Sequence, residues 1–160
     1  MNGGKVIWLT GLPCSGKSTI ANEVAKHRDI KIFDGDTIRA QAGNRDLSYE
    51  GRVKQARQVA TMTSSWQGNA IVAIVSPFKE CRKVSGQILK DRYIEVYIKC
   101  ALDTYIRRDV KGMYKKAKSG EIEQFTGISS PYDIPENPHV VLDTEKLTVE
   151  QCAITILSLL

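Results

Sequence analysis

Residues 11–19 read Gly11-Leu12-Pro13-Cys14-Ser15-Gly16-Lys17-Ser18-Thr19 and follow directly on a short apolar run at residues 5–10. The stretch fits the pattern G-x-x-x-x-G-K-[ST] in full. In a turn from strand to helix, these glycines let the backbone fold around a phosphate with its N–H groups pointing inward, and the helix N-terminus adds a positive dipole end. We therefore predict a nucleoside triphosphate site, with Lys17 on the β and γ phosphates and the Ser18 hydroxyl on Mg²⁺.

Apolar runs and helical patterns alternate along the rest of the chain. The expected strands are residues 5–10, 30–33, 70–75, 93–98 and 140–142, each a short run typical of a strand buried on both faces. The expected helices are residues 18–27, 50–66, 79–90, 102–118 and 148–160. Alternation implies right-handed crossovers, so we expect one α/β domain over residues 1–160, with a five-stranded parallel sheet in three layers. This is the P-loop NTPase and kinase fold.

Residues 119–138 break this alternation. They contain Gly120, Gly127 and three prolines and few apolar residues, and a long irregular segment in a compact domain is often a lid. A dense positive run at residues 107–118 leads directly into it. That run could be a solvated helix, or it could hold the charge of a transferring phosphate. We take the lid as residues 111–138 and name it the lid segment.

Composition limits the classes of protein to consider. The chain has 160 residues, 42% of them hydrophobic and 26% charged, with a net charge of +5, which excludes a disordered or fibrous protein. No apolar run approaches the roughly 18 residues that cross a bilayer, and there is no signal-peptide layout, so we expect a cytoplasmic protein without a membrane partner. The basic residues gather around the lid segment without interleaved aromatics, so we expect no nucleic-acid partner. The four cysteines suggest neither zinc nor disulfides: Cys14, Cys81, Cys100 and Cys152.

The phosphate loop alone does not name a reaction, because regulatory GTPases and transport ATPases share it. The chain has no N-K-x-D guanine signature, and 160 residues leave no room for the second module of a motor or transporter. A small domain with this loop and a lid is most simply a small-molecule kinase. ATP would lie on the loop, and an acceptor would lie across the carboxyl ends of the strands.

Two carboxylates follow the second expected strand. Asp34 and Asp36 stand two residues apart, with Arg39 three residues further on. The carboxylates could orient a metal-bound water or take a hydroxyl proton, and Arg39 could bind an acceptor anion. The same residues could instead form a turn with an Asp N-cap for the next helix.

Three other features each allow two interpretations. Arg52 and Gln55 share a helix face, which could point into a pocket or into solvent. Ser76, after Val75, could bring a hydroxyl to the carboxyl edge of the sheet or simply end the strand. Phe125 stands in the otherwise polar lid segment and could stack on a base or anchor the segment.

Four stretches together resemble the adenylyl-sulfate kinase (APS kinase) family, which phosphorylates the 3′-hydroxyl of adenosine 5′-phosphosulfate (APS) to give PAPS. They are GLPCSGKST at 11–19, FDGDTIR at 33–39, IVSPFKECR at 74–82 and RDVKGMYKKAKSGEIEQFTGISSPY at 108–132. The last is long, unusual and close to diagnostic of the family. The resemblance runs from about Lys5 to the C-terminus and implies an ATP- and Mg²⁺-dependent phosphotransferase of sulfate activation. It also implies a homodimer, since relatives are often dimers.

The resemblance implies a role for each matching residue. ATP and Mg²⁺ would contact Gly11, Pro13, Cys14, Ser15, Gly16, Lys17, Ser18 and Thr19, with Arg108 and Thr144 near the ATP adenine. Ser18 and Asp34 would be the metal ligands. The acceptor would contact Asp36, Arg39, Arg52, Gln55, Val75, Ser76, Lys111 and Phe125. The catalytic set would be Lys17, Asp34, Asp36, Ser76 and Lys111, with Lys115 and Lys116 also meeting phosphate groups. Ser76 matches a serine often labelled a phosphoserine intermediate, but direct in-line transfer needs only positioning and charge stabilisation.

The chain departs from the family mainly before its acceptor-binding helix. The family typically reads DLGFSxxDR, whereas residues 46–52 read DLSYEGR, which lacks a Phe that forms one half of a base sandwich. Tyr49 could supply the missing ring, although its register differs. Gln55 and Thr37 each stand where the family usually has Asn.

These departures motivate an alternative acceptor, another nucleotide 3′-hydroxyl such as that of a cytidine diphosphate derivative (CDP-phosphoramidate) in capsule biosynthesis. A non-catalytic nucleotide-binding regulator is a third interpretation. The intact Lys17, Ser18, Asp34 and Asp36 argue against it.

Overall fold

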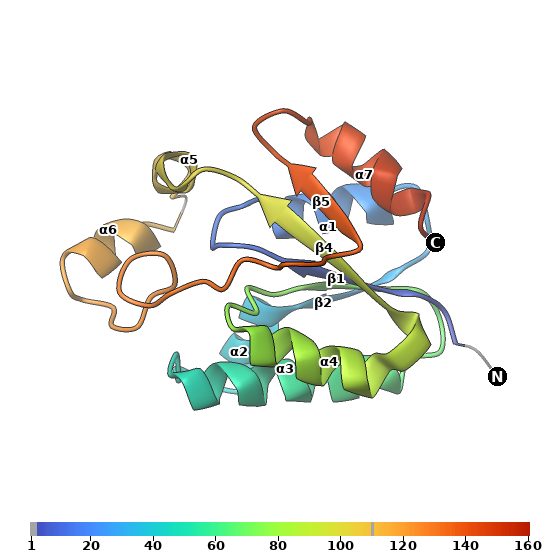
Figure 1. Cartoon of the computed structure of the whole chain (residues 1–160), viewed down its shortest axis with the longest axis horizontal. Helices are drawn as coiled ribbons and strands as arrows, with labels where there is room; N and C mark the ends of the chain where they lie inside the picture. Colours follow the sequence, from blue (N-terminus) through green and yellow to red (C-terminus); the bar gives the residue numbers. More distant parts are fainter. Residues whose placement is uncertain (1–2, 110) are drawn as a thin grey trace.

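Five short strands form a parallel sheet, as expected from the apolar runs (Figure 1). The computed structural model describes residues 3–109 and 111–160. The strands are β1 Val6–Thr10, β2 Lys31–Asp34, β3 Ala70–Ala73, β4 Tyr93–Lys99 and β5 Val140–Asp143, in the order β2-β3-β1-β4-β5. Every residue of the central strand β1 is buried, which is the reason that its sequence is apolar throughout.

Helices cover both faces of the sheet. One layer consists of α1 Lys17–Ala25 and α7 Val149–Leu157, and the other consists of α2 Gly35–Gln41, α3 Tyr49–Ser64 and α4 Lys79–Leu89, which is followed by the 3₁₀ turn η1 Lys90–Arg92 (Figure 1). Side chains of β1 alternate between the two cores: Ile7 and Leu9 lie in the core with α1 and α7. Val6 and Trp8 lie in the core with α3 and α4. The predicted three-layer α/β architecture is confirmed.

A third, smaller core lies under the lid segment. Two short helices, α5 Leu102–Arg107 and α6 Met113–Lys118, extend away from the sheet together with the irregular chain that follows them (Figure 1). Tyr105, Tyr114 and Phe125 are buried together here.

The prediction of one helix over residues 102–118 was wrong. Helix α5 ends at Arg107, and Gly112 precedes α6 with a φ of 65° in the left-handed region, which ends a right-handed helix and favours glycine. The Asp109 carboxylate accepts a hydrogen bond from the Lys115 backbone N–H at 3.1 Å and so caps the start of α6.

The ends of two strands also differ from expectation. Strand β3 ends at Ala73, so Val75 lies outside the strand, in a connector before α4 that also contains Ser76. After β2, the chain enters helix α2 at once, with Asp34 as its N-cap. No helix in the described part of the chain is both long and apolar enough to span a membrane.

The strand register places the functional sequence stretches at one edge. Asp34 pairs with Ala73, and Ala73 pairs with Leu9. The chain therefore leaves β1 for the glycine-rich loop, and leaves β2 for Asp34–Asp36, at the same level of the sheet.

Candidate active site

A cavity of about 790 Å³ lies at this edge of the sheet. Its walls come from the loop after β1, the start of α2, one face of α3, the end of β3, the lid segment and the start of α7. Most of the predicted site residues line it: Pro13, Cys14, Ser15, Gly16, Lys17, Ser18, Thr19, Asp34, Asp36, Arg39, Arg52, Gln55, Val75, Arg108, Lys111, Phe125 and Thr144. Gly11 and Ser76 are not among the lining residues.

The loop after β1 has the close packing that its glycines allow. A Cβ on Gly11 would lie 2.7 Å from the Ile98 carbonyl oxygen, and Gly16 has a φ of +104°. The Lys17 ammonium is held inside the loop, where Nζ donates to the carbonyls of Gly11 and Leu12 at 3.0 Å each. Burial lowers the pKa of Lys17 to about 8, although the nearby charge of Asp36 works in the opposite direction.

Asp34 connects the phosphate loop to α2. Its Oδ2 accepts from the Ser18 hydroxyl at 2.7 Å, and its Oδ1 accepts from the Thr37 backbone N–H at 3.0 Å. Partial burial raises the pKa of Asp34, but the hydrogen bonds from Ser18 and Thr37 outweigh it and the net pKa is lowered. Asp34 therefore caps α2, as one interpretation of the sequence has it, and it also faces the phosphate loop.

The Ser18–Asp34 pair fits a magnesium ion. Mg²⁺ takes oxygen ligands and is commonly held by one or two carboxylates together with substrate phosphates and waters. Within residues 3–109 and 111–160 no group of three or more His, Cys, Asp or Glu side chains could hold a metal by itself. A hydroxyl and one carboxylate beside a phosphate loop are consistent with a metal that arrives with its nucleotide.

Asp36 pairs with the lid segment across the cavity. Its Oδ2 lies 3.3 Å from the Lys111 ammonium, and both side chains are largely exposed. An exposed ion pair of this kind contributes little to stability. Lys111 is therefore free to exchange this carboxylate for a phosphate at little cost.

Two guanidinium groups define the other half of the cavity. Arg39 donates to the Asp46 carbonyl at 2.8 Å and to the Gln55 side-chain oxygen, while Gln55 donates to the Gly35 carbonyl at 3.1 Å. Arg52 is only 8% exposed. Its Nη2 lies 3.4 Å from the Thr126 hydroxyl, and its Nε has no partner among the described residues.

The electrostatics of this half favour an anion. Burial, followed by the charge of Arg39, lowers the pKa of Arg52 to about 10. A guanidinium that is buried beside a second one is stabilised by any anionic group placed between them.

One predicted site residue, Ser76, and one residue considered as a replacement for the missing ring, Tyr49, do not bring their side chains to the cavity. The structure corrects the prediction that the Ser76 side chain belongs to the site. This side chain is 2% exposed, and its hydroxyl accepts a hydrogen bond from the Trp8 indole at 2.9 Å, away from the cavity. Tyr49 is 49% exposed and packs on Phe78 with ring centroids 4.8 Å apart, so it does not supply a ring to the cavity.

Phe125 anchors the lid segment and also borders the cavity. It lines the cavity, and it is also 3% exposed and packs edge-on against Tyr114 with centroids 5.0 Å apart. It therefore anchors the lid segment while one part of it borders the site.

Several lining residues were missed by reasoning from sequence. They include Leu47, Met113, Leu147, Thr148, Val149 and Cys152. Leu47 follows Asp46, whose carbonyl binds Arg39. Leu47 belongs to the stretch at residues 46–52 that lacks the Phe of the family, and this departure could have indicated Leu47 as a lining residue.

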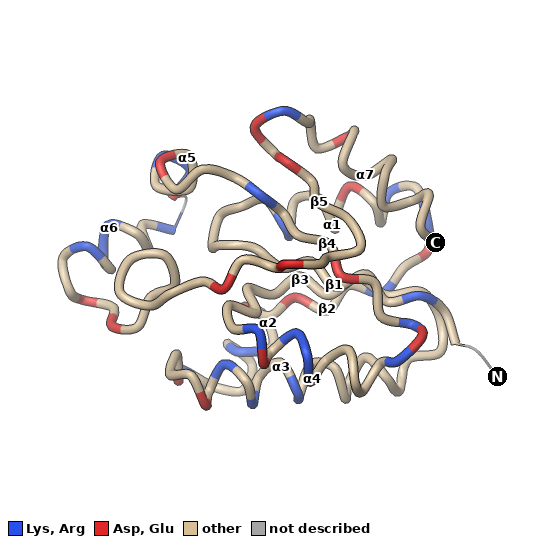
Figure 2. The backbone as a smooth tube through the Cα atoms, in the orientation of Figure 1, with Lys and Arg blue, Asp and Glu red and all other residues tan. Residues whose placement is uncertain are grey.

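Positive charge gathers at the mouth of the cavity. Figure 2 shows lysines and arginines on α5 and α6, beside the loop that leaves β1. Arg108 donates to the Thr144 hydroxyl at 3.4 Å and so joins the lid side to the loop after β5. Lys115 and Lys116 are exposed and outside the cavity lining.

A phosphate loop that faces a second, guanidinium-rich subsite across one cavity is the arrangement of a P-loop kinase acting on a small anionic acceptor. A family model described as adenylylsulphate kinase matches residues 3–143. The chain belongs to this adenylyl-sulfate kinase family.

Individual relatives agree with this assignment. A probable adenylyl-sulfate kinase of Aeropyrum pernix is 40% identical over 159 residues, which cover 92% of this chain and 87% of the relative. An adenylyl-sulfate kinase of Bacillus licheniformis is 44% identical over 158 residues, covering 92% and 80% of the two chains. The Mycobacterium tuberculosis APS kinase, solved in complex with AMPPNP and APS, superposes with a TM-score of 0.90 at 32% identity, covering 99% of this chain and 98% of that one.

Proposed function

We propose that this protein transfers the γ-phosphoryl group of ATP to the 3′-hydroxyl of APS and releases PAPS and ADP. One observation carries the proposal: a single cavity brings Lys17, Ser18 and Asp34 together with Arg39 and Arg52. The names of the relatives, and the APS and AMPPNP bound to the Mycobacterium tuberculosis enzyme, support this choice of substrates.

The nucleotide half of the cavity positions the donor. Backbone N–H groups of residues 11–19 and the N-terminus of α1 would surround the β and γ phosphates. Lys17 would exchange the carbonyls of Gly11 and Leu12 for phosphate oxygens. Ser18 and Asp34 would hold Mg²⁺, which neutralises phosphate charge when it is bound.

The transfer itself needs positioning and one proton acceptor. The 3′-oxygen forms a bond to the γ-phosphorus as the bond to the ADP oxygen breaks, and the hydroxyl proton passes to Asp34 or Asp36. Lys111 would leave Asp36 for the transferring phosphoryl group and stabilise its charge. We further propose that residues 111–138 act as the lid of this domain.

The acceptor half would bind the anionic end of APS. Arg39 and Arg52 would hold the phosphosulfate, with Gln55 fixing the orientation of Arg39. Phe125 would offer its ring to the adenine, and Leu47 would form the opposite apolar surface.

Phe125 is the only aromatic residue that lines the cavity among the residues that the structure describes, and this favours a second candidate. A cytidine diphosphate derivative carries a smaller base, which needs less stacking area than a purine does. The transfer chemistry would be unchanged, and only the acceptor would differ.

The initial rate of ADP formation tests the proposal. Wild-type protein is supplied with Mg·ATP and with APS, a cytidine diphosphate derivative, or no acceptor, and Lys17→Ala serves as the inactive control. A rate with APS far above the other two supports the proposal. A rate that rises only with the cytidine compound would replace APS with the second candidate, and ATP binding without any acceptor-dependent ADP would indicate a regulator.

A further inference from the structure

Arg82 is the centre of a buried polar cluster outside the cavity. The side chain is 6% exposed and comes from the end of the first turn of α4. Its Nη1 donates to the Ser76 carbonyl at 2.8 Å, its Nη2 donates to the Asp133 carbonyl at 2.6 Å, and its Nε lies 3.9 Å from the Glu95 carboxylate. One guanidinium therefore joins three segments that are far apart in the sequence.

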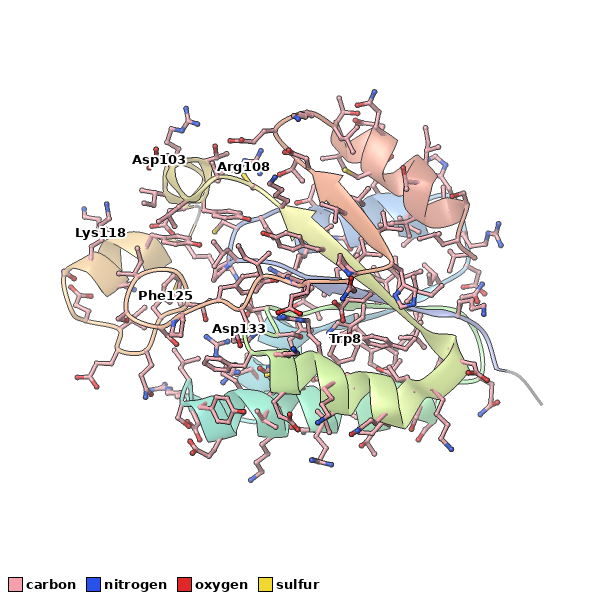
Figure 3. The ribbon with its side chains drawn as sticks, in the orientation of Figure 1. Trp8, Asp103, Arg108, Lys118, Phe125 and Asp133 are labelled. Carbon is pink, nitrogen blue, oxygen red and sulfur yellow. The ribbon has the colours of Figure 1, made fainter. Side chains whose placement is uncertain are left out.

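The Asp133 carbonyl belongs to the end of the lid segment, where the chain returns to the sheet (Figure 3). Here Asp133 also donates its backbone N–H to the Pro77 carbonyl at 2.7 Å. Its carboxylate accepts from the Lys79 backbone N–H at 3.0 Å, at the first residue of α4. The returning lid segment thus caps α4 and is fixed to the connector at residues 74–78.

Tyr132 adds a second attachment beside Asp133. Its ring lies under the Arg82 guanidinium at 5.7 Å, and its hydroxyl shares a hydrogen bond of 2.8 Å with the Thr10 hydroxyl. Thr10 in turn donates to the Val75 carbonyl at 2.7 Å. Arg82, Tyr132 and Thr10 therefore connect the returning lid segment at residues 132–133 to the connector at residues 74–78. We call this connection the joint.

This joint borders the acceptor half of the cavity. Val75 of the connector lines the cavity, as does Phe125 of the lid segment. Thr126, which follows Phe125, meets the Arg52 guanidinium at 3.4 Å. A shift of the joint would therefore move the residues that face the acceptor.

The nucleotide half has a separate attachment to the lid segment. The Tyr114 hydroxyl donates to the Pro13 carbonyl in the phosphate loop at 2.9 Å. The lid segment is thus fixed by two tyrosine hydroxyls, that of Tyr132 to Thr10 and that of Tyr114 to Pro13, and these two groups can be removed independently.

We propose that Arg82 is a positioning residue for the acceptor half of the site. It fixes the returning lid segment to the connector at residues 74–78, so that Val75, Phe125 and Thr126 keep their places around the acceptor. An arginine suits this role because its planar fork can bind two carbonyls and face a carboxylate at once, whereas a lysine ammonium acts as a point charge. The proposal rests on the proposed function, since its kinetic test uses APS.

Steady-state kinetics of Arg82→Lys give the first test. We expect KM for APS to rise by about tenfold and kcat to fall, because a displacement of about 1 Å in a positioning group can cost up to about 100-fold. KM for ATP should stay within about twofold, since the contacts of Arg82 among the described residues go to Ser76, Asp133, Glu95 and Tyr132 and not to the phosphate loop. Equal changes in both KM values, or no change in either, would overturn the proposal.

Two matched tyrosine variants keep the test valid if Arg82→Lys does not fold. Tyr132→Phe removes only the hydroxyl bound to Thr10 and leaves the ring under Arg82, whereas Tyr114→Phe removes only the hydroxyl bound to Pro13. We expect Tyr132→Phe to raise KM for APS and Tyr114→Phe to raise KM for ATP. The opposite pattern, or the same pattern from both variants, would contradict the assignment.

Hydrogen exchange gives a readout that does not depend on the acceptor. In Arg82→Lys or Tyr132→Phe, backbone amides of residues 125–133 and 75–79 should exchange faster than in the wild type, while residues 11–19 stay unchanged. Unchanged exchange in residues 125–133 would overturn the positioning role. If the wild type does not phosphorylate APS but this exchange pattern holds, the proposed function fails and the role of Arg82 stands.

Discussion

The two halves of the cavity are built in different ways. The phosphate-binding part of the nucleotide half is one continuous stretch, residues 13–19, with Asp34 as its main outside partner. The acceptor half takes Arg39 from α2, Arg52 from α3 and Phe125 from the lid segment. A half made from consecutive residues can be recognised from a pattern, whereas a half assembled from three separate elements depends on the packing of the whole chain.

The polar groups of the two halves also differ in their partners. Lys17 is held by carbonyls of its own loop, but Arg52 keeps one buried donor without a partner among the described residues. An anion beside Arg52 would therefore gain a charge-assisted hydrogen bond at little competing cost. Substitutions in the nucleotide half should accordingly change the binding of ATP, and substitutions in the acceptor half should change the binding of APS.

The largest expected effect follows from Lys17→Ala. Loss of the ammonium should lower kcat by about 10³-fold, because a single group that stabilises developing charge is commonly worth about 10²–10³-fold. Lys118→Ala, which changes an exposed lysine outside the cavity lining, serves as the control and should retain the wild-type rate. The rates come from coupled measurement of ADP with saturating APS, and a Lys17→Ala rate near that of the control would show that the nucleotide half is wrongly assigned.

Arg52→Ala should separate the two halves most clearly. We expect KM for APS to rise by about 10- to 150-fold, since hydrogen bonds to charged groups contribute about 1.5–3 kcal/mol. KM for ATP should remain almost unchanged. Arg57→Ala removes an exposed arginine from the same helix and should leave both constants unaltered. A rise in KM for ATP alone would place Arg52 in the wrong half.

The affinity for ATP should depend on pH through Lys17. Because burial lowers the Lys17 pKa to about 8 and a bound triphosphate favours the ammonium, binding above pH 8 must take up a proton. Below pH 8 the Lys17 side chain is already protonated, so binding takes up no proton. The affinity for ATP is therefore full below pH 8 and is lost as the pH rises above it. With a free-enzyme pKa of about 8, affinity should fall about tenfold between pH 7 and pH 9.

Calorimetric titration with AMPPNP in buffers of different ionisation enthalpy measures this proton uptake. Lys17→Arg supplies the control, since a guanidinium keeps its charge throughout this range and its affinity should stay level. A wild-type affinity that is equally level would show that Lys17 is fully protonated in the free protein at pH 9.

The smallest expected effect comes from Leu47→Phe. An aromatic ring at this position would face the base from the side opposite Phe125, and an aromatic pair adds about 0.5–1.5 kcal/mol. KM for APS should therefore fall by about 2- to 10-fold, with KM for ATP unchanged. Leu102→Phe changes an exposed leucine outside the cavity and is the matched control. An increase in KM for APS would mean that Leu47 does not border the base.

The sequence predicted the elements that depend on local patterns. The five strands are short apolar runs, and β1 with its loop was recognisable because G-x-x-x-x-G-K-[ST] has one structural solution after a strand. Asp34 was identified for the same reason, as the carboxylate at the end of the next strand. These features need no knowledge of distant contacts.

Features that depend on distant contacts were predicted less well. Helical spacing over residues 102–118 does not reveal that Gly112 takes a left-handed conformation or that Asp109 caps a new helix. The Ser76 hydroxyl bonds to the Trp8 indole, and Ser76 has a φ of 46°; no pattern in the sequence indicates either feature. Arg82 was not singled out, because its partners at Asp133 and Glu95 become neighbours only after folding.

A single-turnover experiment tests most directly whether the two halves act together on APS. Wild-type protein is mixed with Mg·ATP labelled in the γ-phosphate and with excess APS, and the labelled products are separated by chromatography. We predict that the label passes to the 3′-position of PAPS at the rate at which ADP forms, and that Arg52→Ala slows this transfer while ATP binding persists. Label released as inorganic phosphate, or retained in ATP while APS is bound, would contradict the assignment of both halves to one phosphoryl-transfer site.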